Sequence, residues 1–306
     1  MAKLTGKYAL AERGDRGLNI TINVLLVIFS AVIIYPLWYV IIASFSDPTA
    51  INMGEVFLWP VDFTLDGYTE LIKDELIWTG YRNTLIYVVV AVVWTLIRLI
   101  PAAYALSRKD LPGRKWITLF FMLTMYFGGG MVPKFVLVSN IGWYGNPAAI
   151  LFTSGLGAYN LVLVRSFFMS NVPDSLFDAA RIDGCSYTRF FLKVVLPLSG
   201  SIIAIMTLFT AQGMWNTYLD AELYLPNSKY WTLQQVLRNI ATASATFVGD
   251  SELLTPEQVE EMERLARRAN LLKYTTVIVA SIPMIVLYPF IQKHFVKGIM
   301  VGSVKG

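Results

Sequence analysis

Few side chains in this 306-residue chain are of the types that perform covalent or hydrolytic chemistry. His294 is the only histidine and Cys185 the only cysteine, which excludes an intrachain disulfide and a metal cluster of Cys and His ligands. Neither has an evident catalytic partner. The seven carboxylates of residues 46–80 are better explained as a solvated acidic loop than as an acid/base pair. We therefore expect no enzyme active site and no bound cofactor in this chain.

Two short motifs suggest nucleotide binding, and both fail on their context. Residues 128–134 resemble a phosphate-binding loop, but Phe135 stands where Ser or Thr is required, the spacing is wrong and no strand precedes the glycines. Residues 198–201 resemble the start of an ATPase signature, yet an apolar segment typical of a membrane helix follows them. The chain itself is therefore not expected to bind ATP.

A polar, glycine-broken segment at residues 171–195 separates two apolar stretches, and its residue types suit the docking of another protein. Pro173 and Asp174 can begin a helix, and the carboxylates of Asp174 and Asp178 are favourable near its positive N-terminal end. An ordinary amphipathic loop helix is the simpler alternative, because an Asp-Ala-Ala sequence alone is frequent.

The next residues of this segment predict a close contact followed by a turn. Ala179 and Ala180 leave a smooth helix face that permits close docking. Gly184 lets the backbone turn into a second short helix, which Phe190 and Leu192 are expected to attach to the rest of the protein.

The elements that position this segment are membrane helices. Hydrophobic residues make up 56% of the chain and charged residues 15%, and the mean hydropathy is +0.55. About 20 apolar residues cross the hydrocarbon core of a bilayer. Stretches of that length predict six spans in one 306-residue membrane domain: about 18–45, 83–107, 116–139, 147–169, 196–218 and 271–292.

The distribution of basic residues predicts the orientation of these spans. Lysines and arginines occur in the N-terminal segment, in the 107–115 and 171–195 loops and in the C-terminal tail, whereas the 46–80 loop is acidic. Basic loops are typical of the cytoplasmic side. Both termini and the 171–195 loop are therefore expected in the cytoplasm, and the pI near 9.0 requires no nucleic-acid partner.

Glycines interrupt the third apolar stretch, and a long loop follows the fifth. Gly128-Gly129-Gly130 can allow close helix packing or mark an unwound segment, and we favour close packing. In the outer loop, residues 219–270, the turn signal at 226–228 predicts a small hairpin or an irregular loop. Residues 255–269 predict an amphipathic helix of about four turns.

The 171–197 segment resembles the cytoplasmic loop of permease subunits of ABC importers, which carries Glu-Ala-Ala, three residues, Gly, nine residues, Ile, one residue, Leu-Pro. Here Asp178 stands for the glutamate, Val194 stands for the isoleucine, and Leu196-Pro197 begin the fifth span. The ending of the chain, residues 288–306, is similar to the tail of MalG-like sugar permeases. Residues 45–48, 83–85, 128–133 and 215–216 suggest the LplC/YtcP-like branch.

This resemblance implies an all-α polytopic membrane protein with the type I (MetI/MalG-like) permease fold and a cytoplasmic coupling helix. It implies a bacterial plasma-membrane importer with a second, different permease subunit, two cytoplasmic ATPase subunits that hold ATP and Mg²⁺, and an extracytoplasmic sugar-binding protein. Membrane lipid surrounds the permease. The branch favours oligosaccharides released from polysaccharides, acidic ones included.

The resemblance also implies roles for particular residues. Those carried over as ATPase-coupling residues are Asp178, Ala179, Ala180, Asp183, Gly184, Leu196 and Pro197. In MalG-like proteins the C-terminal tail reaches between the ATPase subunits, which assigns that contact to Gly302, Ser303, Val304, Lys305 and Gly306.

Residues that contact the sugar are less visible. Trp215, Asn216, Tyr218 and Asp220 cluster at the outer end of the fifth span, and they are the candidates for a sugar path or a binding-protein contact. Most other aromatic residues are expected at the membrane interface or in packing.

Two other classes of protein were weighed against this interpretation. An ion-coupled secondary transporter or channel should show carboxylates within the membrane or inverted repeats, and an intramembrane enzyme needs polar catalytic residues at membrane depth. The predicted spans show neither pattern.

Overall fold

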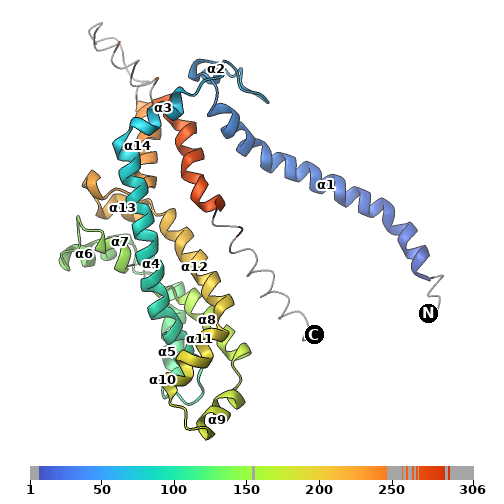
Figure 1. Ribbon diagram of the computed structural model, residues 1–306, viewed down its shortest axis with the longest axis vertical. Helices are drawn as coiled ribbons and strands as arrows, with labels where there is room; N and C mark the ends of the chain where they lie inside the picture. The colour runs from blue at the N-terminus through green and yellow to red at the C-terminus, as the bar shows by residue number, and fades with distance from the viewer. Residues whose placement is uncertain are drawn as a thin grey trace. The chain divides into compact units, whose positions relative to one another are not determined.

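The computed structural model describes residues 7–153, 156–246 and 269–286, together with the single residues 257, 260, 264, 267 and 289. The regular elements of these residues are helices (Figure 1). The chain divides into two compact units. The first consists of residues up to Lys73 and of Ile240–Val279, and the second of Asp74–Asn239 and the residues from Ala280 onward.

The first unit contains α1 (Lys7–Ala43), α2 (Pro48–Asn52), α3 (Asp66–Lys73) and most of the helix Ala269–Val286. α3 packs tightly against this last helix, because a Cβ atom at Gly67 would lie 2.8 Å from the backbone oxygen of Leu271. The ring of Tyr39 meets that of Tyr274 edge-on, with 6.1 Å between the centroids.

The second unit is a bundle around α4 (Glu75–Ser107), whose main contacts are with α8 and α12. The elements after α4 are α5 (Arg114–Tyr126), α6 (Met131–Asn140), α7 (Ala148–Thr153), α8 (Ala158–Asn171), α9 (Asp174–Ile182), α10 (Tyr187–Phe190), the π-helix η1 (Phe191–Val195), α11 (Leu196–Leu198), α12 (Gly200–Trp215), α13 (Leu219–Tyr224), the 3₁₀ turn η2 (Ser228–Tyr230) and α14 (Leu233–Thr246). α14 begins in the second unit and ends in the first.

Several of these helices are long and apolar enough to cross a membrane. Within the described ranges they are Gly17–Ala43, Glu75–Ser107 and Ala269–Val286, and the number rises to 5 if each of two bent helix pairs counts as one span. The predicted fourth stretch is divided between α7 and α8. The multi-pass helical architecture is thus present, while the count of six spans remains a prediction.

The third predicted span is broken, and the preference for close packing at its glycines is wrong. α5 and α6 meet at 114° across residues 127–130. Cβ atoms added at Gly128 and Gly129 would meet nothing within 4 Å, and Gly130 has a φ of 82°. These glycines therefore end one helix and change the direction of the chain. Glycine is suited to this because it lacks a Cβ atom and adopts backbone conformations that other residues avoid.

The fifth predicted span, 196–218, is also shorter and bent. Helical residues Tyr187–Leu198 meet α12 at 76°, and the apolar helix runs only from Gly200 to Trp215. Pro197 has no N–H group to donate to a carbonyl of the preceding turn. The π-helix η1 ends two residues before Pro197, and the hydroxyl of Ser199 donates to the Val195 oxygen at 2.6 Å.

Of the two alternatives predicted for 226–228, the structure shows the irregular loop and not the hairpin: a loop with one 3₁₀ turn lies between two helices. α13, η2 and α14 occupy residues 219–246. The Asn83 side chain of α4 donates to the backbone oxygens of Lys229 and Trp231 at 2.9 and 3.0 Å, and the Thr84 hydroxyl accepts the Leu233 N–H at 2.8 Å. The predicted 255–269 helix and the tail from Gly302 to Gly306 lie almost wholly outside the described residues.

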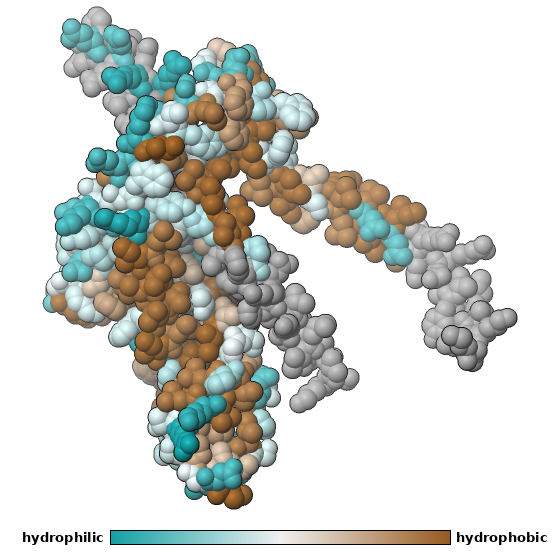
Figure 2. All heavy atoms as spheres, in the orientation of Figure 1, coloured by the Kyte–Doolittle hydropathy of each residue, from teal (hydrophilic) through white to brown (hydrophobic). Residues whose placement is uncertain are grey.

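Two hydrophobic cores lie along α4. One joins the C-terminal half of α4 to α8, α9, α10 and α12, and the other joins its N-terminal half to α6, α7 and α13. Figure 2 shows apolar side chains along α1 and along the helices of the second unit, and hydrophilic side chains among apolar ones at the end that carries α9. α9 therefore extends a packed core into a polar end of the bundle.

Candidate functional site

α9 begins where the sequence predicts, at Asp174 directly after Pro173. Proline disfavours a helical conformation of the residue before it, and Val172 accordingly leaves the helix with φ −121° and ψ 84°. The Asp174 carboxylate lies in the first turn, where the helix dipole favours negative charge. After Ile182 the chain turns at Gly184, whose φ of 74° is readily adopted only by glycine.

One side of α9 is held by Phe177, of which 2% of the surface is exposed. Its ring centroid lies 4.9 Å from that of Tyr187 and 5.2 Å from that of Phe190. Phe177 and Phe190 belong to the core that also contains residues of α4, α8 and α12. An aromatic cluster therefore attaches α9 and α10 to the bundle.

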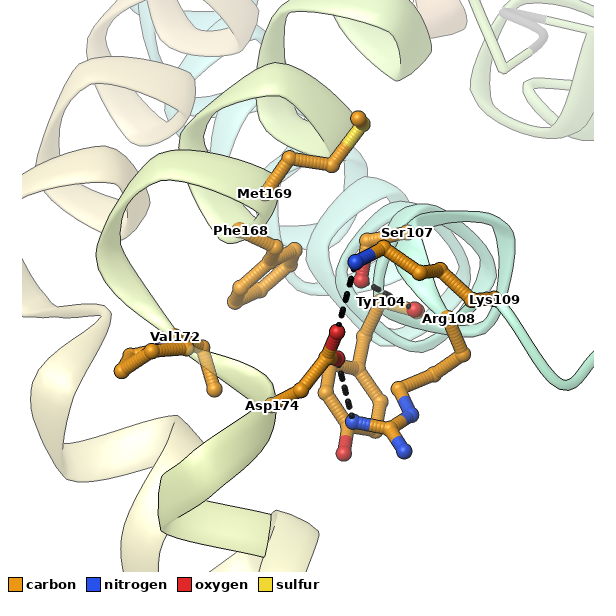
Figure 3. Close-up of a pocket in the computed structure, with 9 residues that line it drawn as sticks. Tyr104, Ser107, Arg108, Lys109, Phe168, Met169, Val172 and Asp174 are labelled. Atoms are coloured by element: carbon orange, nitrogen blue, oxygen red, sulfur yellow. Dashed lines mark hydrogen bonds and ion pairs between the residues drawn. The ribbon is translucent and has the colours of Figure 1, made fainter.

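The turn between α4 and α5 attaches the same two helices through polar contacts (Figure 3). Arg108 Nη1 lies 3.5 Å from Asp174 Oδ1, and Lys109 Nζ lies 2.9 Å from Asp174 Oδ2. Arg108 Nε lies 3.3 Å from Asp110 Oδ1, and the Tyr187 hydroxyl lies 3.1 Å from Asp110 Oδ2. Three consecutive residues of this turn thus contact α9 and α10.

Arg108 differs from its ionic partners in burial. Its side chain is 14% exposed, whereas those of its partners Asp174 and Asp110 are 48% and 47% exposed, and that of the neighbouring Lys109 is 76% exposed. Its guanidinium carbon lies 4.0 Å from the ring centroid of Phe177. A cation over an aromatic face is worth more when water is excluded, while an exposed ion pair contributes little. Arg108 is therefore the main polar contact of the turn.

The carboxyl groups of Asp110 and Asp174 lie outside the membrane-spanning segments, and their surroundings favour the charged form of both. The hydrogen bond from Lys109, reinforced by the positive charges of Lys109 and Arg108, holds the pKa of Asp174 below its usual value. Burial acts to raise the pKa of Asp110, but hydrogen bonds from its own backbone, Tyr187 and Arg108 outweigh burial and lower it. The ionic contacts therefore persist at neutral pH.

A cavity of about 280 Å³ lies between the end of α4, the end of α8 and the start of α9. Figure 3 shows Phe168 and Met169 on one side of it and the charged groups on another. Arg108 and Lys109 both pair with Asp174, and Arg108 also pairs with Asp110, so both cations of the lining already have carboxylate partners. The cavity is thus the space around a contact between helices.

The predicted coupling residues lie on α9, on the turn directly after it and on α11. Asp178 and Ala179 are exposed, while Ala180 is half-buried against the core. Among the other predicted residues, Asp183, Gly184 and Pro197 are exposed and Leu196 is half-buried. α9 therefore has a packed side, which carries Phe177, and an open side with small and acidic residues.

The two residues predicted to attach the second short helix behave differently. Phe190 is 1% exposed, as expected. The prediction for Leu192 is wrong, because 56% of its surface is exposed. The π-helix η1 contains Leu192, and Val195 is the residue of η1 that enters the core.

Sequence reasoning missed the contact between α9 and the α4–α5 turn. In the sequence, Arg108 and Lys109 indicate only the side of the membrane on which their loop lies, and Asp174 follows Arg108 by 66 positions. A weak signal was present, since Arg108 follows directly on α4 and Asp174 directly on the break after α8. These adjacent helices bring both residues to one end of the bundle.

The four predicted sugar-path residues have separate surroundings. Trp215 is 4% exposed and meets the Tyr81 ring edge-on, with 5.7 Å between the centroids. Asn216 is exposed, and the half-buried Tyr218 lies under Arg238, whose guanidinium carbon is 5.1 Å from the ring centroid. The indole of Trp215 therefore packs within the bundle.

Asp220, the fourth of these residues, forms an ion pair with α6. Its Oδ2 lies 2.8 Å from Lys134 Nζ, and both side chains are partly exposed. In the part of the chain that the structure describes, no group of three or more His, Cys, Asp or Glu residues could hold a metal ion. The four predicted sugar-path residues thus include a packed indole and a carboxylate in an ion pair.

Comparison with known proteins gives a consistent result along the chain. Residues 76–301 match the family described as the binding-protein-dependent transport system inner membrane component. The polygalacturonan/rhamnogalacturonan transport system permease protein YtcP of Bacillus subtilis strain 168 is 38% identical over 285 residues, covering 92% of this chain and 96% of the relative.

A second relative and a solved structure agree with this match. Protein LplC of Bacillus subtilis strain 168 is 33% identical over 279 residues, which cover 90% of each chain. A chain in the crystal structure of a bacterial ABC transporter involved in the import of the acidic polysaccharide alginate aligns with a TM-score of 0.82 and 32% identity, covering 92% of this chain and 98% of that one. Sequence and fold are thus similar over the same length.

Proposed function

The chain belongs to the family of binding-protein-dependent transport system inner membrane components, and from this premise we propose that it is the permease subunit of an ATP-driven importer of oligosaccharides. It crosses the bacterial plasma membrane six times, with both termini in the cytoplasm. α9 is its coupling helix. The observation that carries the proposal is the two-sided burial of α9, with Phe177 packed in the core and Asp178 and Ala179 exposed.

This geometry suits the transmission of force. An ATPase subunit that binds the open side of α9 moves the helix as it closes. Because Phe177 and Phe190 share a core with α4, α8 and α12, a displacement of α9 is carried into those helices. Packed interfaces respond to such displacements by rigid-body movement. Alternating access to the two sides of the membrane follows from that movement.

The work is divided among several subunits. Two cytoplasmic ATPase subunits bind ATP and Mg²⁺, a second and different permease subunit completes the membrane part, and an extracytoplasmic binding protein delivers the sugar. This chain is not an enzyme. The tail residues Gly302 to Gly306 contact the ATPase subunits, and the exposed apolar residues of α1 face lipid or the other permease.

The cargo is an oligosaccharide derived from a polysaccharide, acidic ones included. The names of YtcP and of the alginate importer, which refer to acidic polysaccharides, support this assignment. At the outer end, Asn216, Tyr218 and Asp220 are accessible enough to contact the sugar or the binding protein, while Trp215 supports them from within.

Uptake by a reconstituted importer that contains this chain tests the proposal. ATP should drive accumulation of an acidic oligosaccharide such as oligogalacturonate in proteoliposomes. Deletion of residues 174–190 should abolish both uptake and co-purification of the ATPase subunits. ATP-coupled uptake by the deletion variant would refute the role of α9, and uptake driven by an ion gradient without ATPase subunits would favour a secondary transporter. Glycan binding to the partner binding protein identifies the sugar.

A further inference from the structure

The α4–α5 turn contacts α9 although the two are not neighbours in the chain. The backbone connects α9 to α8 through residues 172–173 and to α12 through residues 183–199. At the end of α4, side chains make this connection: Arg108 and Lys109 contact Asp174 of α9. α9 is therefore connected to the C-terminal end of α4 by ionic contacts between side chains.

Arg108 is well placed to make that connection stiff. It is the C-cap residue of α4, and its N–H donates to the Ala105 oxygen at 3.2 Å, so its backbone moves with the helix. Its side chain contacts both the Asp174 carboxylate and the Phe177 ring. A planar guanidinium with several donors fixes direction as well as distance, which a flexible ammonium does not.

A displacement of the C-terminal end of α4 is transmitted along the whole helix. α4 is a single helix of 33 residues, about 50 Å long at 1.5 Å per residue. Its N-terminal half shares a hydrophobic core with α6, α7 and α13, and Asn83 and Thr84 form hydrogen bonds with η2 and α14. A displacement of the C-terminal end of α4 therefore also displaces η2 and α14.

We infer that Arg108 is a positioning residue that transmits the movement of α9 directly to α4. The inference rests on the proposed function, since it takes α9 as the element that the ATPase subunits move. It assigns to Arg108 a polar link between α9 and the end of α4, in addition to the hydrophobic core that α9 shares with α4, α8 and α12. It does not place Arg108 in the ATPase contact, because 14% exposure leaves the guanidinium little surface to offer a partner.

The test compares four variants of the assembled importer in proteoliposomes: Arg108→Gln, Asp174→Asn, the double variant, and the control Lys115→Gln. Lys115 is an exposed cation of the neighbouring first turn of α5, so its variant removes the same charge without the contact. The quantities measured are ATPase co-purification, ATP hydrolysis and oligosaccharide molecules imported per ATP.

Arg108→Gln should retain ATPase co-purification and hydrolysis while lowering import per ATP by about fivefold or more, the size of a typical coupling between sites. Asp174→Asn should act in the same direction. The loss in the double variant should fall short of the product of the two single losses, because both changes remove the Arg108–Asp174 contact, although Asp174→Asn also removes the pair with Lys109. Lys115→Gln should stay within about twofold of the wild type. Arg108→Lys keeps the charge but not the planar guanidinium, so its import per ATP should lie between those of the wild type and Arg108→Gln. It replaces Arg108→Gln in the test if that variant does not assemble.

Three outcomes would overturn the inference. Unchanged import per ATP in Arg108→Gln would show that the contact transmits nothing, and multiplicative effects in the double variant would show that Arg108 and Asp174 act separately. Loss of ATPase co-purification in assembled Arg108 variants would make Arg108 a docking residue instead. Failure of the proposed function itself is distinguishable, because the wild-type chain would then show no ATP-coupled import.

Discussion

Replacing Phe177 with alanine is expected to release α9 from the bundle. The Phe177 ring fills the space between α9, Tyr187 and Phe190, and the Arg108 guanidinium covers it. Alanine removes the ring and leaves a cavity at the point where α9 meets the core. The links of α9 that remain include the ionic contacts of Asp174, the half-buried Ala180 and the backbone connections.

The size of the effect follows from the burial of the ring. With 2% of its surface exposed, Phe177 falls in the class for which Phe→Ala costs about 3–5 kcal/mol. Each 1.4 kcal/mol changes an equilibrium tenfold. If the loss is confined to α9, its opening equilibrium rises by between about 10² and about 4 × 10³, while the transmembrane helices keep their stability.

Hydrogen exchange of the full-length chain in nanodiscs measures this local opening. Amides of α9 should exchange faster by that factor in Phe177→Ala, and amides of α4 and α12 should be unchanged. Ile182→Ala is the matched control, because Ile182 lies on the same helix with 88% of its surface exposed. Equal exchange of α9 in both variants would refute the reasoning that Phe177 attaches the helix.

Three further predictions concern single contacts. Lys109 lowers the pKa of Asp174 in the folded chain. The difference in unfolding free energy between the wild type and Asp174→Asn should therefore be complete above about pH 4, and it should vanish as the pH falls through the lowered pKa of the folded chain. A difference that grows on acidification would contradict the ion pair. Gly184→Ala should cost about 1–2 kcal/mol in thermal unfolding because φ is 74°, whereas Gly213→Ala inside α12, where a Cβ meets nothing within 4 Å, should be neutral or stabilising. Thr84→Val should cost about 1–3 kcal/mol by leaving a buried N–H of α14 without its acceptor, and Thr84→Ser, which keeps the hydroxyl, should restore most of the loss.

The parts of the fold that could be predicted from the sequence are those set by local chemistry. The start of α9 at Pro173-Asp174 and the turn at Gly184 depend on backbone restrictions that each residue carries with it. The apolar stretches likewise located the long helices Glu75–Ser107 and Ala269–Val286 to within several residues at their described ends. Local signals suffice where one residue type fits the conformation.

The parts that were missed depend on distant contacts. Whether Gly128-Gly129-Gly130 allows packing or unwinds a helix is decided by what surrounds it, and the sequence does not give those neighbours. The residues after α12 form helices because Asn83 and Thr84 of α4 bind their backbone. The pairing of Arg108 with Asp174 likewise requires the bundle to be assembled first.

Cross-linking from α9 to an ATPase subunit tests the central claim most directly. In a Cys185→Ser background, a cysteine at the exposed Ala179 should form a cross-link to the ATPase subunit whose yield changes when ATP is bound. A cysteine at Leu219, which is 55% exposed at the other end of α12, should form none. A cross-link from Leu219 and none from Ala179 would contradict the assignment of α9 as the helix through which ATP-driven movement enters this chain.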